Sequence, residues 1–376
     1  MKLTLVTETF PPEINGVAMT LRHLVEGLAG RGHEVSVCRP RQGKGDTDNV
    51  RHGWSELLFP GMPLPGYAML RMGMPAFGRL RRQWSAERPD VVHVATEGPL
   101  GWSALRAAGA LGIPVSSSFH TNFHHYSRHY GAAWLTRPAL AYLRWFHNRA
   151  RITLSPTAEL NTELARDGFR GLRLLARGVN TKRFSPRARD ESLRRSWGAE
   201  RDDLAVIHVS RLAKEKNYPL VLRCWEAIRA RHPRARFVLA SDGPMRKKLR
   251  RLAPWAQHTG FLSSDELARH YASADLFLFA SLTETFGNVV TEGMASGLPV
   301  LAYDYAAPAR FIRSGENGVT VPFDRPDLFF EAALVLAADA PLRLRLGEAA
   351  QSTAQTIPWE PVVAGFEADL RSLLAL

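Results

Sequence analysis

The hydrophobic positions in the first half of the chain alternate between short continuous runs and a helical spacing. Residues 3–7 form an apolar run typical of a buried strand, and apolar residues then recur every three or four positions over 17–28. The same alternation predicts a helix at 100–111 and further strands at 34–38, 90–95, 115–119 and 152–155. Strands that alternate with helices favour a parallel sheet with helices on both faces.

The second half repeats this pattern. Strands are predicted at 204–210, 237–240, 276–279 and 300–302, whereas residues 177–186 contain turn formers and no periodicity. We therefore predict an α/β protein of two Rossmann-like, doubly wound domains that face each other across an interdomain cleft. The expected domains are 1–182 and 183–358, followed by a helix at 359–376 that packs back on the N-terminal domain. Functional residues are expected at the carboxyl ends of the strands.

Composition agrees with two globular domains and adds a charge argument. The 376 residues are 45% hydrophobic, and the formal net charge of +13 favours a polyanionic partner such as a nucleotide, a nucleic acid or an anionic membrane. Cys38 and Cys224 are the only cysteines, which suits a reducing compartment. No run approaches the length of a signal peptide or of a spanning helix, so we expect a cytoplasmic protein, either soluble or peripherally bound to a membrane.

Two loops are candidates for phosphate binding. The first joins the strand at 3–7 to a helix, with Asn15 and Gly16 where a phosphate could rest on the helix N-terminus; the alternative is an ordinary tight turn. The second follows the strand at 204–210, where Arg211 and Lys216 could together neutralise a diphosphate. A solvated basic loop is the alternative for this second segment.

The segment 283–299 is the most informative. Glu284 precedes a predicted helix, where it could accept hydrogen bonds from sugar hydroxyls, and the backbone amides of Gly287, Asn288 and Val289 could bind phosphate. Glu292 follows about two turns later if the helix starts at once, and it could accept both hydroxyls of a ribose. The alternative is that these acids only cap a helix.

These motifs together resemble glycosyltransferase family 4, whose hallmark is a pair of glutamates separated by seven residues, as in Glu284 and Glu292. The resemblance runs from residue 3 to about 358 and includes Phe286 and the turn Ser241-Asp242-Gly243-Pro244, in which the family usually has glycine where Ser241 stands. It implies the GT-B fold and a retaining, metal-independent transfer from a nucleotide-diphosphate sugar, which is a co-substrate rather than a cofactor.

The resemblance also implies roles for individual residues. His120, which ends a predicted strand, would lie near the reacting carbon of the sugar or hydrogen-bond the acceptor. The expected catalytic residues are His120, Glu284, Arg211 and Lys216. The expected donor-binding residues are Asn15, Gly16, Arg211, Lys216, Asp242, Gly243, Phe286, Gly287, Asn288, Val289 and Glu292.

Metal binding has little support in the sequence. His120, His124, His125 and His129 cluster, but no acid or cysteine accompanies them between 120 and 151. Asp46 and Asp48 imitate the metal-binding carboxylate pair of other glycosyltransferases, but their Gly- and Lys-rich surroundings indicate a solvated loop. We expect no metal.

The acceptor is suggested by two segments of the N-terminal half. Residues 54–84 combine apolar side chains with arginines, and 121–151 contain arginines and aromatic residues without any acid, a composition that suits a membrane interface. The alternative is a pair of amphipathic helices that cover the core. The segment His120 to Phe123 resembles the diacylglycerol and phosphatidylinositol glycosyltransferases of the family, which favours a lipid acceptor at the inner face of the plasma membrane.

Other readings remain open. A soluble sugar or a polysaccharide precursor could be the acceptor, and a nucleotide-sugar epimerase is the enzymatic rival. Nucleic-acid binding agrees with the isoelectric point of 10.2, but no nucleic-acid motif is present. The donor is expected to be of the UDP-glucose or GDP-mannose type; base, sugar, linkage and oligomeric state are not readable from the sequence.

Overall fold

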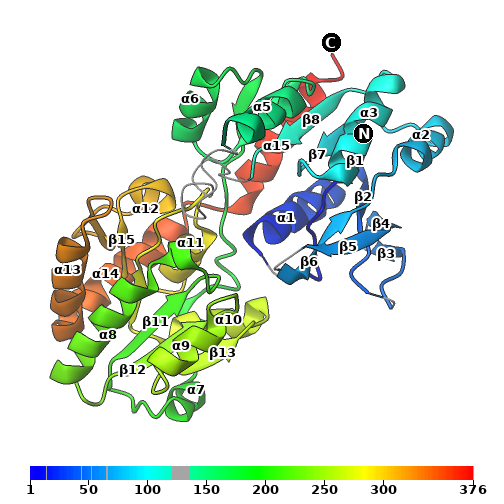
Figure 1. Ribbon diagram of the computed structural model, residues 1–376. Coiled ribbons are helices and arrows are strands. Elements are labelled where there is room, and N and C mark those ends of the chain that lie inside the picture. The colour runs from blue at the N-terminus through cyan, green and yellow to red at the C-terminus, as the bar shows by residue number, and fades with distance from the viewer. Residues whose placement is uncertain (14, 44, 52, 65–66, 121–135, 376) are drawn as a thin grey trace. The chain divides into compact units, whose positions relative to one another are not determined.

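A computed structural model describes the chain except for residues 14, 44, 52, 65–66, 121–135 and 376 (Figure 1). The chain divides into two compact units. Unit 1 contains Met1–Arg177 and Trp359–Leu376, and unit 2 contains Gly178–Pro358. The chain therefore leaves unit 1 at the start of the segment 177–186 and returns to it with the last helix.

The main sheet of unit 1 has eight strands in the order β10-β9-β8-β7-β1-β2-β4-β3, of which only the edge strand β3 is antiparallel to its neighbour. Its strands are β1 (Lys2–Val6), β2 (Glu34–Pro40), β3 (Asn49–Arg51), β4 (Trp54–Phe59), β7 (Val91–Val94), β8 (Val115–Ser118), β9 (Ile152–Ser155) and β10 (Leu172–Leu174). A separate antiparallel pair is formed by β5 (Gly61–Leu64) and β6 (Tyr67–Gly73). The strand order reverses between β1 and β7, which makes that position the switch point of the sheet.

The described helices of unit 1 are α1 (Gly16–Gly30), α2 (Phe77–Ala86), α3 (Pro99–Ala110), α5 (Thr136–His147), α6 (Ala158–Arg166) and α15 (Trp359–Ser372). The terminal helix α15 lies beside α1 (Figure 1), and its Val363, Phe366 and Leu370 belong to the same core cluster as Leu21 and Leu24 of α1. The two helices pack closely at Gly27, where an added Cβ would lie 2.6 Å from Val363 Cγ2. The last helix is thus an integral part of the unit 1 core.

The stretch 54–84 differs from the amphipathic helix that was one interpretation of its sequence. Its described residues form β4, β5 and β6, and α2 is the only helix among them. Four of its large apolar residues, Trp54, Phe59, Leu80 and Trp84, are buried, whereas Met62 and Met74 are exposed. Helical periodicity does not predict these strands, because prolines interrupt the segment and its apolar residues pack against both β2 and α3.

Unit 2 has a six-stranded, fully parallel sheet in the order β13-β12-β11-β14-β15-β16. Its strands are β11 (Ala205–Val209), β12 (Arg236–Ala240), β13 (Gln257–Gly260), β14 (Leu276–Phe279), β15 (Val300–Tyr303) and β16 (Val319–Val321). Its α-helices are α7 (Glu191–Ser196), α8 (Tyr218–Arg231), α9 (Arg246–Leu252), α10 (Ser264–Ser273), α11 (Asn288–Ala295), α12 (Ala306–Phe311), α13 (Pro326–Ala338) and α14 (Ala340–Ala354).

Both faces of the unit 2 sheet are covered. Successive residues of β11 enter opposite cores, because Val206 packs in one cluster with Trp225 of α8 and Ile207 packs in the other with Tyr271 of α10. A strand buried on both faces is mostly apolar, as β11 is except for His208. A continuous apolar run, rather than an alternating pattern, therefore predicted this strand. The prediction of doubly wound parallel sheets is confirmed in each unit. Among the described helices, none combines the length and the apolar character that a membrane span requires.

Candidate active site

The predicted donor residues gather at the switch point of the unit 2 sheet. The strand order reverses between β11 and β14, and side chains that follow neighbouring strands there lie at one edge of the sheet. Arg211 and Lys216 follow β11, and Glu284 follows β14. The topology therefore brings together residues that are far apart in the sequence.

Lys216 and Glu284 are in direct contact. The Lys216 ammonium pairs with Glu284 Oε1 and also donates to the hydroxyl of Ser281 and the carbonyl of Thr283, both at 3.2 Å. Lys216 is only 7% exposed, so the alternative of a solvated basic loop is wrong for this residue. A lysine with such a low exposure requires anionic and polar partners, which Glu284 and its loop supply.

Arg211 is held by a second carboxylate. Its Nη2 donates to Glu215 Oε1 at 2.5 Å, within the single 3₁₀ turn Lys214–Lys216 that separates Arg211 from Lys216. Glu215 is buried, whereas 35% of the Arg211 side chain is exposed. Both predicted cations thus have acidic partners, and Arg211 keeps an accessible face.

The turn at Asp242 and Gly243 supports the Arg211 loop. The amide of Leu212 donates to the carbonyl of Asp242 at 3.0 Å, and the amide of Met245 donates to the carbonyl of Leu212 at 2.9 Å. A Cβ at Gly243 would lie 2.6 Å from that Leu212 oxygen, so the two backbones approach as closely as they do only because residue 243 is glycine. The Asp242 carboxylate accepts from the Gly243 amide and from Arg246.

Ser241 shows why the family usually has glycine at this position. Its φ is 129°, in the region that L side chains rarely adopt, and its amide donates to the carbonyl of Gly260 at 3.1 Å. The serine keeps the backbone conformation at the cost of strain. Its amide is already engaged with β13.

Glu292 lies one turn inside α11 rather than two turns, because the helix begins only at Asn288. Gly287, with a φ of 98°, is the N-cap of this helix. Because glycine has no side chain, the first amides of the helix find no side-chain acceptor on the capping residue. Phe286 is buried and its ring packs edge-on against Phe311. Burial raises the pKa of Glu292 to about 7, and the Tyr271 hydroxyl donates to its Oε2 at 3.4 Å.

His120 in unit 1 is a buried, neutral histidine that follows β8. Its Nδ1 accepts from Arg177 Nη2 at 3.0 Å. Burial, followed by the positive charge of Arg177, lowers the pKa of His120 well below its usual value. Because Arg177 can only donate, Nδ1 is the unprotonated nitrogen and Nε2 carries the hydrogen. His124, His125 and His129 lie outside the described residues, and the structure has no bearing on the histidine cluster.

The side chain of Asn15 is engaged by the helix that follows it. Asn15 is the N-cap of α1 and its side chain accepts from the Ala18 amide at 2.9 Å, while its Nδ2 donates to Thr9 Oγ1 at 2.6 Å. Gly16 is the first residue of that helix. The geometry accounts for Asn15 as a structural cap, and phosphate binding here stays a prediction.

Two carboxylates near this loop were not among the predicted site residues. Glu8 accepts hydrogen bonds from the amides of Gly73 in β6 and Leu100 in α3, the latter at 3.0 Å, and Glu13 accepts from the amide of Arg71 at 3.3 Å. Desolvation raises the pKa of Glu8 to about 7 and also raises that of Glu13. The available signal was positional, since Glu8 comes directly after the first strand, at the switch point of unit 1.

The Asp46 and Asp48 pair does not lie in a simply solvated loop. Asp46 forms an ion pair with Arg39 at 2.6 Å, and Asp48 accepts from the Leu58 amide at 2.9 Å. Both carboxylates therefore hold the β2–β4 connection. Within the described ranges no group of three or more His, Cys, Asp or Glu side chains is arranged to hold a metal ion.

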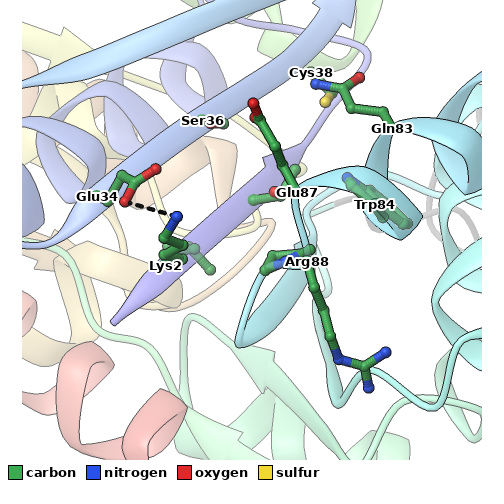
Figure 2. Close-up of a pocket in the computed structure, with 11 residues that line it drawn as sticks. Lys2, Glu34, Ser36, Cys38, Gln83, Trp84, Glu87 and Arg88 are labelled. Carbon is green, nitrogen blue, oxygen red and sulfur yellow. Dashed lines mark ion pairs between the residues drawn. The ribbon is translucent and has the colours of Figure 1, made fainter.

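A small pocket lies elsewhere in unit 1. Figure 2 shows it between α2 and one face of β1 and β2, where Lys2 and Glu34 form an ion pair at 3.4 Å. Its volume of about 30 Å³ suits a water molecule and is far too small for a nucleotide sugar. Cys38 lines it, but burial raises the pKa of this thiol to about 12, so it is not a reactive nucleophile.

Comparisons with known proteins agree with these motifs. Residues 14–183 match the family described as Glycosyltransferase Family 4, and residues 203–339 match Glycosyl transferases group 1. The GDP-mannose-dependent alpha-mannosyltransferase of Mycolicibacterium smegmatis is 34% identical over 96% of this chain and 95% of its own length. Its counterpart in Mycobacterium tuberculosis is 34% identical over 86% and 84%. The alpha-monoglucosyldiacylglycerol synthase of Acholeplasma laidlawii is 28% identical over 85% and 84%.

Solved structures show the same fold at lower identity. Sucrose-phosphate synthase from Thermosynechococcus elongatus superposes with a TM-score of 0.79 at 18% identity, covering 100% of this chain and 99% of the other. HepE of Anabaena in complex with UDP-glucose gives 0.78 at 18% identity, with 99% and 100% covered. Together with the two doubly wound units, these similarities establish the GT-B fold. The chain belongs to glycosyltransferase family 4 and is a nucleotide-sugar-dependent hexosyltransferase.

Proposed function

We propose that this enzyme transfers a mannosyl group from GDP-mannose to a hydroxyl group of a membrane lipid, with retention of configuration and without a metal ion. The observation that carries the proposal is the contact between Lys216 and Glu284 at the unit 2 switch point, with Arg211 and Glu292 on the flanking elements. This arrangement supplies cations for a diphosphate and carboxylates for hydroxyl groups at one edge of one sheet.

The cations act on the leaving group. As the glycosidic bond breaks, negative charge develops on the diphosphate, and Arg211 and Lys216 stabilise it from fixed positions. Arg211 offers a planar guanidinium with an exposed face, and Lys216 offers a compact charge. The first amides of α11, from Asn288 onward, add the partial positive charge of a helix N-terminus.

The two glutamates act on hydroxyl groups. Lys216 turns from Glu284 to the diphosphate when the donor binds, and Glu284 then accepts hydrogen bonds from the sugar. Glu292, one turn into α11, accepts the ribose hydroxyls. Because Nδ1 of His120 accepts from Arg177, the ring hydrogen lies on Nε2. In this role Nε2 donates to an oxygen of the sugar or of the acceptor.

The donor assignment rests on relatives. Three that are 32–34% identical are named GDP-mannose-dependent alpha-mannosyltransferases, and the chain covers 76–95% of their length. A glucosyl donor such as UDP-glucose is the second candidate, because two relatives at 28% identity are named alpha-monoglucosyldiacylglycerol synthases.

The lipid acceptor is supported by names of relatives and by the surface of unit 1. The synthases named above and a phosphatidylinositol dimannoside mannosyltransferase, which is 26% identical, are named for lipid products or acceptors. Exposed residues of α5 include Tyr142 and Trp145, with the guanidinium of Arg149 3.8 Å above the Trp145 ring. Aromatic and arginine side chains of this kind suit a peripheral position at the inner face of the plasma membrane.

The side chains of α2 differ in how well they could contact a membrane surface. Phe77 on α2 is half-buried, and the guanidinium of Arg106 lies 5.0 Å from its ring centre. Arg79 donates to the Leu58 carbonyl at 3.0 Å and covers Phe59, so it serves the fold. Arg81 and Arg82 on α2 are exposed and are the better candidates for an anionic surface.

Product analysis tests the proposal. Purified enzyme is incubated with GDP-mannose or UDP-glucose, labelled in the sugar, and vesicles that contain diacylglycerol, with a soluble sugar acceptor in parallel. The expected result is an α-linked mannolipid, identified by chromatography and by the anomeric coupling in NMR. A β-linked product would exclude retention, efficient transfer to the soluble acceptor alone would exclude the lipid, and sugar-nucleotide isomerisation without an acceptor would favour an epimerase.

A further inference from the structure

Glu215 has a setting that the proposed mechanism does not explain. It is a carboxylate of only 1% exposure in the 3₁₀ turn between the two cations of the site. Its Oε1 accepts from Arg211 Nη2. Burying an acid is costly unless it is paired and hydrogen-bonded, so the position of this side chain requires a compensating interaction.

The electrostatics favour an ionised Glu215. Burial alone would raise its pKa, but the hydrogen bond from its own backbone amide and the charges of Arg211 and Lys216 outweigh burial, and the pKa is lowered. Arg211 therefore faces a permanent negative charge. A guanidinium bonded to a fixed carboxylate is restricted in orientation, because its donors lie in one rigid plane.

The backbone of the loop is held independently of the Glu215 side chain. The Leu282 amide donates to the Glu215 carbonyl at 2.9 Å, and the Leu212 amide donates to the Asp242 carbonyl at 3.0 Å. Both bonds involve main-chain atoms only, so they persist when the side chain is changed. The carboxylate thus acts mainly on the Arg211 side chain.

We propose that Glu215 is a positioning residue, which orients the Arg211 guanidinium toward the diphosphate of the donor. The inference rests on the proposed role of Arg211 and extends it to a residue that does not itself touch the substrate. It distinguishes Glu215 from a carboxylate that merely stabilises the fold, because its effect must pass through Arg211.

A double-mutant cycle measures this dependence. Turnover at saturating donor is compared for wild type, Glu215→Ala, Arg211→Ala and the double variant, with whichever of GDP-mannose and UDP-glucose the wild type uses. We expect Glu215→Ala to lower kcat about tenfold in the wild-type background and to have no further effect in the Arg211→Ala background. Glu215→Gln, which retains an acceptor oxygen of the same reach, should recover part of the loss.

Controls separate the possible failures. Arg22 and Glu26 on α1 form an exposed pair of the same spacing at 2.7 Å, and Glu26→Ala should leave kcat unchanged. Equal effects of Glu215→Ala in both backgrounds would overturn the positioning role while leaving Arg211 in place; if Glu215→Ala does not fold, the same comparison is made with Glu215→Gln. An active Arg211→Ala enzyme, or a wild type that uses neither donor, would overturn the proposed function, and the role of Glu215 with it.

Discussion

The two units share a topology but carry opposite chemistry at their switch points. In unit 2, the loops after β11 and β14 bring Arg211 and Lys216 to the carboxyl edge, each paired with an acid. In unit 1, the corresponding edge between β1 and β7 carries Glu8, whose carboxylate is bonded to backbone amides. The fold decides where a site lies, and the side chains that follow the strands decide what it binds.

The carboxylates near the two switch points also differ in their partners. In unit 2, Glu215 and Glu284 pair with the cations Arg211 and Lys216, and the pKa of Glu215 is lowered, whereas burial raises the pKa of Glu292 to about 7. Glu8 in unit 1 has amide donors but a pKa raised to about 7 by burial, which makes it a group that changes charge near neutral pH. We infer that unit 2 is built for phosphate and that the Glu8 edge is a structural anchor for β6 and α3.

The pH dependence of stability tests the role of Glu8 as an anchor. Glu8 has its pKa raised from 4.5 to about 7 in the folded state, so the folded protein binds the proton more tightly than the unfolded chain. Its contribution to stability is full below pH 4.5 and is lost as the pH rises to 7, a change of about 3 kcal/mol. Urea unfolding at pH 5 and 7.5 should show a smaller loss of stability in Glu8→Gln than in wild type. Equal losses would show that Glu8 does not titrate in this range.

Removal of either cation of unit 2 comes next. Arg211→Ala or Lys216→Ala should lower turnover by on the order of a hundredfold, because each removes a preorganised positive group from developing charge. Donor affinity, measured by calorimetry with GDP, should fall as well. Folded variants with wild-type rates would contradict the diphosphate assignment.

Membrane attachment tests unit 1. Reversing two exposed charges, in Arg81→Glu/Arg82→Glu, should remove about 1 kcal/mol or more of binding per residue from vesicles with anionic lipid, and wild type should bind neutral vesicles weakly. Sedimentation at low and high salt measures this, since electrostatic binding weakens with ionic strength. A wild type that stays in the supernatant with both vesicle types would argue for a soluble acceptor.

The two glutamates of unit 2 should separate in kinetics. Glu284→Gln should mainly lower kcat, by about tenfold, whereas Glu292→Gln should mainly raise KM for the donor, because the first is assigned to the reacting sugar and the second to the ribose. Small and equal effects of both substitutions would remove this division of roles.

The sequence predicts the four central strands of the unit 2 sheet but not its edge strands β13 and β16, for a physical reason. Strands buried on both faces are continuous apolar runs, and residues that follow β11 and β14 must meet at one edge, so Lys216 and Glu284 could be assigned to one site without a structure. The partners of Glu8 and Arg39 could not be assigned in this way, because they lie on strands and helices whose register no local pattern reveals. For a related reason, the strands of segment 54–84 were not predicted. Its apolar residues belong to β4 at one end of the segment and to α2 at the other.

In the proposed mechanism Arg211 and Lys216 neutralise the diphosphate in place of a metal ion, and removal of metal ions with a chelator tests this role. Turnover of the purified enzyme is measured with excess EDTA and then with added magnesium or manganese. We expect the same rate in all three conditions, and folded Asp46→Asn/Asp48→Asn enzyme should be equally insensitive to EDTA. Complete loss of activity in EDTA that either ion restores would contradict it.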